Sequence, residues 1–325
     1  MRDKILETLL DNKGNFTSGE ELSEKLKRPS KDIGEYIEVL RSKGYNIEQV
    51  KKKGYKVEDN LDDLLTHNNI SYKLDTKYIG RSIIYFDTID STNDYAKKVA
   101  IQEQDGTVII SEEQTKGKGR IGRQWVSKSR EGIWMSVILK PNLKPYKAPF
   151  LTLMAGASIA KSLNNLGVEA SIKWPNDIII NNKKVAGILT ELSAEIDKIN
   201  YIVLGIGINV KTIEFSQEIF DIATSLYKEG HKLSRVDIVR EILEEFERLY
   251  LQYINYDLKN ETLDICRKHS AIIGKDIYVI RNGEKELVKC LDINKDGNLV
   301  IKNNENVIKE IMSGEVSIRG VDGYV

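Results

Sequence analysis

The first sixty residues alternate apolar and polar positions in a way that predicts three helices followed by a hairpin. Apolar residues recur at helical spacing near the start of the chain, again after Ser18, and again after Pro29. Ser18, with Glu21 three residues later, forms a capping box at the start of the second helix. Two short strands follow, joined by the turn at Lys51 to Gly54. This order of elements predicts a winged helix-turn-helix domain for residues 1–60.

The pattern changes after a linker-like stretch at residues 61–80, and strands and helices interleave over residues 81–270. The expected strands are 83–86, 107–111, 133–139, 169–174, 177–181, 184–193 and 200–208, and the expected helices are 93–103, 149–166, 234–254 and 261–269. Consecutive strands joined by tight turns, such as Asn181 to Lys184, require antiparallel pairing. The fold class is therefore α+β with a mixed sheet, and a doubly wound parallel sheet is not expected.

Short alternating strands fill the remainder of the chain, residues 271–325. Asn-Gly at 282–283 and Asp-Gly at 296–297 are typical hairpin turns. We expect a small β-barrel here, as a third domain.

Composition narrows the possible functions. The formal net charge is +0, so binding to nucleic acid would require a local basic patch. The two cysteines and three histidines are too scattered for a zinc site or a histidine-based triad. There is no apolar run long enough to span a bilayer, and the first residues predict no signal peptide. We expect a cytoplasmic protein without membrane partners.

The predicted third helix is acidic where a DNA-reading helix is usually basic. Asp32, Glu35 and Glu38 would oppose phosphate. The candidate DNA contacts are Lys31, Arg41, Lys51, Lys52 and Lys53, most of them in the turn of the hairpin. Two interpretations stay open for this domain, which are operator binding and a structural or interaction module.

A glycine-rich loop within residues 112–127 is the strongest signal for chemistry. It combines three glycines with four cations, so backbone amides and positive charge converge where an anion could lie. Gly117 to Gly122 matches G-x-G-x-x-G, but strand-like residues follow it, and no acidic residue lies about twenty positions on. Neither H-R-D nor D-F-G follows. A Rossmann turn and a kinase loop are both excluded.

Together with four other stretches, the loop resembles the biotin protein ligases of the bacterial class that also represses the biotin operon. The stretches are DSTNDYA (90–96), KWPNDI (173–178), KVAGIL (184–189) and GIGINV (205–210). The resemblance covers nearly the whole chain. It implies a central catalytic domain of the biotin/lipoate ligase type, which is class II synthetase-like, and an SH3-like C-terminal domain.

The resemblance also implies the reaction. Biotin would be activated by ATP and Mg2+ to biotinyl-5'-AMP and then transferred to a lysine of a biotin carrier domain, such as that of acetyl-CoA carboxylase. Operator DNA and a second copy of the chain are further implied partners. Two rival functions stay open: a lipoate or octanoate ligase, and a biotin-sensing transcription factor without ligase activity.

The family's functional residues carry over to positions in this sequence. The implied catalytic residues are Lys184, Arg120, Lys118 and Asp177. The implied biotin-binding residues are Ser91, Thr92, Asn93, Gln114, Lys118, Gly119, Arg120 and Lys184. The implied ATP or adenylate contacts are Gly117, Arg123, Trp125, Asn176 and Asn209. Mg2+ would arrive with ATP, and no metal-ligand cluster is expected in the chain.

Two of these assignments have a simpler alternative. Ser91 to Asn93 stand where a helix begins and are good capping residues. The amphipathic segment after Asn209 would either fold over the adenylate, as in the family, or pack as an ordinary surface helix. Asp177 would either orient Mg2+ or help the acceptor lysine to lose its proton.

Overall fold

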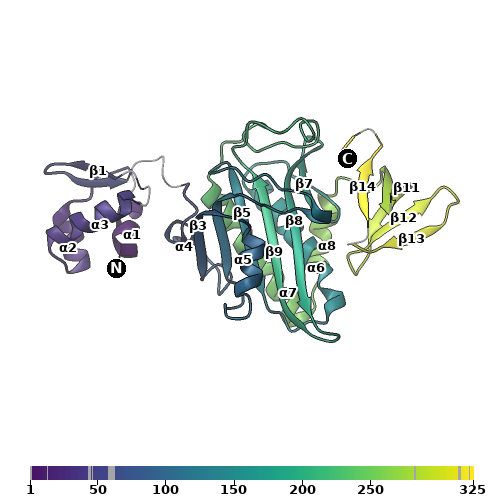
Figure 1. Cartoon of the computed structure of the whole chain (residues 1–325), viewed down its shortest axis with the longest axis horizontal. Coiled ribbons are helices and arrows are strands. Elements are labelled where there is room, and N and C mark those ends of the chain that lie inside the picture. Colours follow the sequence, from purple (N-terminus) through teal and green to yellow (C-terminus); the bar gives the residue numbers. More distant parts are fainter. Residues whose placement is uncertain are drawn as a thin grey trace. The chain divides into compact units, whose positions relative to one another are not determined.

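The computed structural model describes residues 2–12, 14–42, 45, 47–57, 63–281, 283–313, 316–321 and 323–325. It divides into two compact units, Met1–Leu74 and Asp75–Val325 (Figure 1). The predicted domain boundary at residues 60 and 61 and the predicted turn residue Asn282 lie outside the described residues.

The first unit has the three predicted helices and the predicted hairpin, and one further helix, α4. The helices are α1 (Arg2–Asp11), α2 (Gly19–Leu26), α3 (Ser30–Ser42) and α4 (His67–Ser71), and the hairpin strands are β1 (Ile47–Val50) and β2 (Gly54–Val57). The Ser18 side chain accepts a hydrogen bond from the Glu21 amide at the start of α2, as the capping box predicted. Leu22, Ile33 and Ile37 meet in a buried core between the helices. The predicted winged helix-turn-helix domain is confirmed.

Part of the predicted linker packs within this first unit. The Tyr45 hydroxyl donates to Asn69 Oδ1 over 3.1 Å and lies 2.8 Å from Thr66 Oγ1. Thr66 caps α4, and Ile70 is buried. The stretch from Thr66 to Ser71 is therefore an ordered addition to the domain.

A seven-stranded mixed sheet forms the centre of the second unit. Its strands are β3 (Ile83–Ile89), β4 (Val108–Gln114), β5 (Gly132–Leu139), β6 (Ser171–Lys173), β7 (Asp177–Ile180), β8 (Lys183–Ala194) and β9 (Ile199–Asn209), in the order β3-β4-β5-β9-β8-β7-β6. β3 and β4 pair in parallel, and the other neighbours pair antiparallel. The predicted mixed α+β sheet is confirmed.

Helices cover the two faces of this sheet. They are α5 (Thr92–Val99), α6 (Pro149–Asn165), α7 (Arg235–Tyr256) and α8 (Asn260–Lys268). On one face, Ala96 of α5 packs in a buried cluster with Ile138 and Val203. On the other, Gly156 of α6 lies against Ile188, and α6 packs along α7. The face that carries α5 is only partly covered, because α5 is short.

One row of paired residues crosses five strands on the α5 face. Trp134 of β5 pairs with Gly207, Gly207 with Gly187, Gly187 with Asp177, and Asp177 with Lys173. Side chains of directly paired residues point to the same face of a sheet. The two glycines therefore leave a bare patch in the middle of the row, with a carboxylate and an amine beside it.

The last five strands form a small antiparallel sheet. They are β10 (Asp276–Arg281), β11 (Glu284–Ile293), β12 (Leu299–Asn303), β13 (Ile308–Ile311) and β14 (Ser317–Gly320), in the order β13-β12-β11-β10-β14. The predicted run of short antiparallel strands is confirmed, and β13 and β14 are the outer strands of the sheet, so the predicted closed barrel is not formed by strand pairing among the described residues. This small β domain touches the central domain where Trp174 Nε1 donates to the Gly297 carbonyl over 3.0 Å. None of the described helices has the length and apolar character needed to cross a bilayer.

Candidate active site

The glycine loop folds back on itself over the bare patch of the sheet. The Gly119 amide donates to the Arg123 carbonyl over 2.7 Å, and the Trp125 amide donates to the Gly117 carbonyl over 2.9 Å. A Cβ at Gly117 would run into the Trp125 carbonyl and the Ser127 hydroxyl. Gly117 is thus required for the close packing of the loop. It does not line either of the two cavities described below.

A small cavity of about 40 Å3 lies between the loop, the start of α5 and the sheet. All eight residues predicted to bind biotin line it: Ser91, Thr92, Asn93, Gln114, Lys118, Gly119, Arg120 and Lys184. Met135 and Gly205 also line the cavity and make part of its wall apolar, and neither was predicted from the sequence. Gly205 is needed as glycine, because a Cβ there would collide with Asn93.

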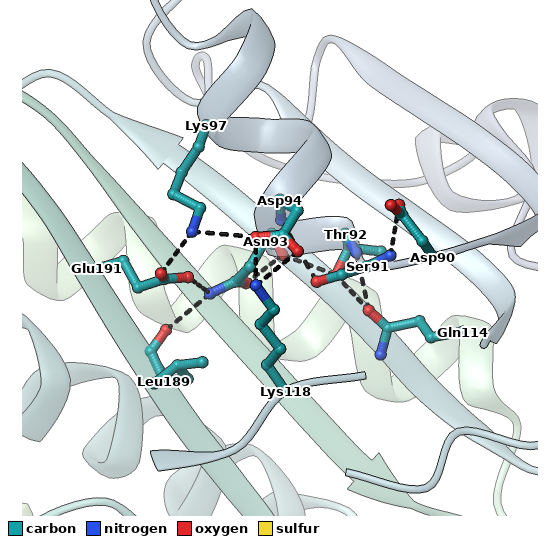
Figure 2. A network of polar contacts seen from close by, with 11 residues as sticks. Asp90, Ser91, Thr92, Asn93, Asp94, Lys97, Gln114, Lys118, Leu189 and Glu191 are labelled. Carbon is teal, nitrogen blue, oxygen red and sulfur yellow. Dashed lines mark hydrogen bonds and ion pairs between the residues drawn. The ribbon is translucent and has the colours of Figure 1, made fainter. Parts of the chain in front are cut away.

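Hydrogen bonds fix the polar side chains of this cavity (Figure 2). Gln114 Oε1 accepts from the Thr92 amide over 2.8 Å and from the Thr92 hydroxyl over 3.0 Å. The Ser136 hydroxyl lies 2.6 Å from Asn93 Oδ1 and 2.7 Å from Thr92 Oγ1. Ser91 caps α5 by accepting from the Asp94 amide. Capping explains Ser91, whereas Thr92 and Asn93 are buried donors and acceptors inside the cavity.

Charged residues flank this network (Figure 2). Lys118 Nζ lies 2.7 Å from one Asp94 oxygen, and Lys97 Nζ lies 2.6 Å from Glu191. Burial alone would raise the pKa of Asp94, but the hydrogen bonds from Lys118 and Lys97 bring it below its ordinary value. Asp94 therefore holds the Lys118 ammonium beside the cavity.

Trp125 separates this cavity from a larger one. A Cβ on Gly187 would lie 3.0 Å from its ring, and one on Gly207 would lie 2.6 Å from its Nε1. The indole thus packs directly on the bare patch of the sheet. Lys184 Nζ lies 5.1 Å from the ring centroid, and Trp125 Nε1 is buried without a hydrogen-bond partner.

The larger cavity encloses about 470 Å3, within the range of small-molecule sites. Six cations line it, which are Arg120, Arg123, Lys128, Lys173, Lys184 and Arg319, against the three carboxylates Glu131, Asp177 and Glu214. Asn176 and Asn209 line it too, each with its amide nitrogen bonded to a backbone carbonyl. This excess of positive charge suits a polyphosphate.

The two cavities meet at five residues, namely Gly119, Arg120, Trp125, Asn176 and Lys184. Arg120 Nη1 donates to Asn176 Oδ1 over 2.5 Å, and Arg120 Nη2 donates to the Val316 carbonyl over 3.3 Å. Burial lowers the pKa of Arg120 but leaves it a permanent cation. Two cations, Arg120 and Lys184, therefore stand at the junction.

Asp177 lies beside this junction. Its Oδ1 is 2.5 Å from Lys184 Nζ, and its Oδ2 accepts from the Tyr324 hydroxyl over 2.5 Å. Burial would raise the pKa of Asp177, but the Lys184 ammonium paired with Oδ1 and the hydrogen bond from Tyr324 hold it below its ordinary value. Asp177 is a carboxylate at neutral pH with both oxygens engaged.

Lys173 is a functional candidate that the sequence reasoning missed. Its side chain is 2% exposed, lines the larger cavity, and has no hydrogen-bond partner for Nζ. The amine sits 3.3 Å from the centroid of the Tyr324 ring. Burial, opposed in part by Asp177, lowers the pKa of Lys173 to about 7. The sequence signal for Lys173 was its place as the first residue of the KWPNDI stretch.

Replacing Lys173 by methionine is expected to change how stability depends on pH. The unfolded lysine binds its proton up to its ordinary pKa, whereas the folded one releases it above about pH 7. Stability of the wild type therefore rises with pH above 7, by up to about 1.4 kcal/mol per pH unit from this group. In urea unfolding, Lys173→Met should exceed the wild type in free energy of unfolding by the largest amount below pH 7. This difference should shrink towards pH 9. A pH-independent difference, like that expected for exposed Lys144→Met, would contradict this.

The candidate DNA contacts are distributed unevenly. Lys51, Lys52 and Lys53 are exposed in the turn between β1 and β2, and Lys31 is exposed on α3. Arg41 is different, because its Nε and Nη2 donate to the Ile47 carbonyl over 3.0 and 2.6 Å. Arg41 ties α3 to the hairpin, so its guanidinium is occupied by the fold.

The segment after Asn209 is not the surface helix that one interpretation predicted. It runs in turns, and Phe215, Ser216 and Ile219 line the larger cavity. Its end is anchored to the site, because the Lys184 amide donates to the Ile222 carbonyl over 2.7 Å. No group of three or more metal-ligating side chains occurs among the described residues.

Comparisons with known proteins agree with this architecture. Residues 85–209 match the biotin/lipoate A/B protein ligase family, residues 2–56 match a helix-turn-helix domain, and residues 272–319 match the biotin protein ligase C-terminal domain. The fold and site thus define a carboxylate-activating ligase that carries a helix-turn-helix domain.

Relatives across the full length make the assignment more specific. The bifunctional ligase/repressor BirA of Bacillus subtilis (strain 168) is 34% identical over 98% of each chain, and that of Escherichia coli (strain K12) is 33% identical over 95% of each. The structure of biotin protein ligase from Aquifex aeolicus in complex with biotin and ATP has a TM-score of 0.65 at 30% identity, covering 74% of this chain and 99% of the other. The chain belongs to the biotin protein ligase family, in its bifunctional ligase/repressor branch.

Proposed function

We propose that the protein activates biotin with ATP to form biotinyl-5'-AMP and transfers the biotinyl group to a lysine of a biotin carrier domain. One observation carries the proposal: a small polar cavity and a large cationic cavity meet at Arg120 and Lys184. The first step brings a carboxylate against the α-phosphate of ATP. Cations fixed at the meeting point of two anions lower that barrier, because they are in place before the charges approach.

The smaller cavity is assigned to biotin. The ureido ring offers two N–H donors and one carbonyl acceptor, and Thr92, Asn93 and Gln114 supply matching polar atoms. Met135, Ile188 and Leu189 add apolar wall for the rest of biotin. At about 40 Å3 the cavity is smaller than biotin needs. We infer that the glycine loop, which carries Lys118 and Trp125, moves outward when biotin enters.

The larger cavity is assigned to ATP. The Trp125 ring offers an aromatic surface for adenine, and Arg123 and Lys128 line the same cavity as cations that could hold the β- and γ-phosphates. Mg2+ accompanies ATP as its phosphate complex. Both oxygens of Asp177 are already engaged, which favours its role towards the acceptor amine over that of a metal ligand.

The first unit is assigned to repression of transcription in response to biotin. Its exposed lysines in the hairpin turn are the favoured phosphate contacts, because the α3 carboxylates weaken a major-groove contact. A DNA partner agrees with the predicted cytoplasmic location. The identity of the carrier and a homodimer through the central sheet remain predictions from the resemblance.

Replacing Lys51, Lys52 and Lys53 together by glutamine is expected to weaken binding to operator DNA, most strongly at low salt. Each lost phosphate contact lowers the slope of log affinity against log salt by about 0.9. Fluorescence anisotropy over a salt series measures both quantities, and ligase activity should stay at the wild-type level. An unchanged slope would show that the hairpin turn does not touch the phosphates, and no binding by the wild type would favour the structural-module interpretation.

The ligase proposal is tested with purified protein, ATP, Mg2+ and either biotin or octanoate, with mass spectrometry to detect the acyl-adenylate. We expect biotinyl-5'-AMP and no octanoyl-AMP. An octanoyl adenylate would favour the lipoate or octanoate ligase. No adenylate with either acid would favour a biotin sensor without ligase activity.

A further inference from the structure

Tyr324 reaches from the small β domain into the larger cavity of the catalytic domain. It is 8% exposed, and its backbone carbonyl accepts from the Gly320 amide at the end of β14 over 3.4 Å. Its hydroxyl donates to Asp177 Oδ2, and its ring covers the Lys173 amine. Arg319 Cζ lies 5.0 Å from the ring centroid. The phenol is thus inserted between a buried carboxylate and a buried amine.

The position that the Tyr324 hydroxyl occupies would also suit an ammonium group as the hydrogen-bond donor. Lys184 marks the junction where the adenylate carbonyl would lie, and it is bonded to Asp177 Oδ1. A nucleophile that approaches this carbonyl from the larger cavity arrives beside Asp177. The remaining oxygen, Oδ2, is the natural acceptor for an incoming ammonium, and the Tyr324 hydroxyl occupies it.

We propose that Tyr324 is a gate for the second half-reaction, the transfer of biotin to the carrier. Its hydroxyl holds the place of the acceptor lysine amine beside Asp177 until the carrier domain displaces it. This inference rests on the proposed ligase function. The occupant that replaces Tyr324 is the lysine ammonium of the carrier. A charged ammonium is a stronger partner for the carboxylate than a phenol, so the exchange favours the carrier.

The chemistry after displacement is acyl transfer. The acceptor ammonium gives one proton to Asp177, and the amine lone pair forms a C–N bond to the carbonyl carbon of the mixed anhydride. The C–O bond to phosphate breaks, and AMP leaves with that electron pair. The second proton leaves the nitrogen to solvent as the amide forms. With Tyr324 seated, a water molecule cannot take the same position and hydrolyse the adenylate.

The electrostatic setting of Asp177 supports this order of events. The charged groups that face it are Lys184 from β8, Lys173 from β6 and Arg120 from the glycine loop, with the Tyr324 hydroxyl as a further donor. Burial raises the pKa of Asp177, and these neighbours lower it. Departure of Tyr324 removes one of the lowering hydrogen bonds. Asp177 therefore becomes a better proton acceptor when the gate opens.

The test compares Tyr324→Ala and Tyr324→Phe with the wild type in single-turnover experiments. Pre-formed biotinyl-5'-AMP complex is incubated without carrier, to measure AMP release by hydrolysis, or with carrier domain, to measure transfer. We expect Tyr324→Ala to hydrolyse the adenylate roughly tenfold faster, the factor that one hydrogen bond to a charged group supports. Tyr324→Phe keeps the ring and should fall between. On the alkaline side of the pH profile, where Asp177 is ionised in all three proteins, transfer to carrier should not slow in either variant.

A second readout separates a gate from a packing contact. Transfer requires ionised Asp177, so its rate rises with pH through the pKa of that group. With carrier below saturation the profile reports Asp177 before Tyr324 is displaced, when only the wild type has the Tyr324 hydrogen bond that lowers this pKa, so the acidic limb should move to higher pH in Tyr324→Phe. Tyr146→Phe, at an exposed tyrosine outside both cavities, is the matched control and should match the wild type in both readouts.

Wild-type hydrolysis rates in both Tyr324 variants, or a slower transfer in both, would overturn the gate while leaving the ligase function intact. A wild-type protein that forms no adenylate would instead overturn the proposed function, and the gate with it.

Discussion

Replacing Lys184 by methionine is expected to slow adenylate formation by about 10²- to 10³-fold, the usual cost of removing one preorganised donor from a site of developing charge. Lys184 lines both cavities and stands at their junction. Its ammonium is the cation closest to Asp177, so its loss also leaves that buried carboxylate without its strongest partner. The length and apolar stem of the side chain are kept by methionine.

Biotin-dependent exchange of pyrophosphate into ATP measures this step alone. Lys183→Met is the matched control, because neighbouring residues on a strand point to opposite faces and Lys183 lines neither cavity. The control should keep the wild-type rate within a factor of about three, well under the loss expected at Lys184. A Lys184→Met rate equal to that of the control would show that Lys184 does not contribute to adenylate formation.

Replacing Glu112 by alanine is expected to destabilise the protein by about 3–5 kcal/mol, the cost of leaving one partner of a buried ion pair unpaired. Glu112 Oε2 lies 2.7 Å from Arg235 Nη1, and both side chains are 2% exposed. Arg235 also donates to the Gly132 carbonyl over 3.0 Å. This pair joins α7 to strands β4 and β5 behind the site. The loss is a large part of an ordinary domain's stability of about 5–15 kcal/mol.

Urea unfolding measures the free energy of unfolding for this variant. Glu113→Ala, at the partly exposed neighbouring position, should cost less than about 1 kcal/mol. The double change Glu112→Leu with Arg235→Met should recover most of the loss, because no charge is then left buried. A single variant as stable as the Glu113→Ala control would show that the pair contributes nothing.

Local patterns predicted most of the fold. Helices with clear periodicity and caps, such as α2 behind Ser18, have the predicted positions within a few residues. The antiparallel run from β6 to β9 followed from turns too short for a crossover. The helix that packs beside the winged domain, α4, could not be foreseen as part of that unit, because its contacts with Tyr45 are more than twenty residues apart in sequence.

The candidate site was predictable where the chemistry lies in contiguous motifs. The stretches around Ser91, Arg120 and Lys184 carry their own signals, and the structure places them along one pair of cavities. Tyr324 gave no signal, because it meets Asp177 across 147 positions of sequence. The bare patch under Trp125 depends on glycines in two paired strands, and the pairing register cannot be obtained from either strand alone.

The most direct measurement of the central claim is transfer of biotin to a carrier. Protein, biotin, ATP and Mg2+ are incubated with a biotin carrier domain, and the modified residue is located by tandem mass spectrometry. We predict biotinylation at the single acceptor lysine of the carrier, none when that lysine is replaced by arginine, and none with Lys184→Met on the same timescale. Adenylate formation without any transfer to the intact carrier would contradict the claim that these two cavities form a complete biotin protein ligase.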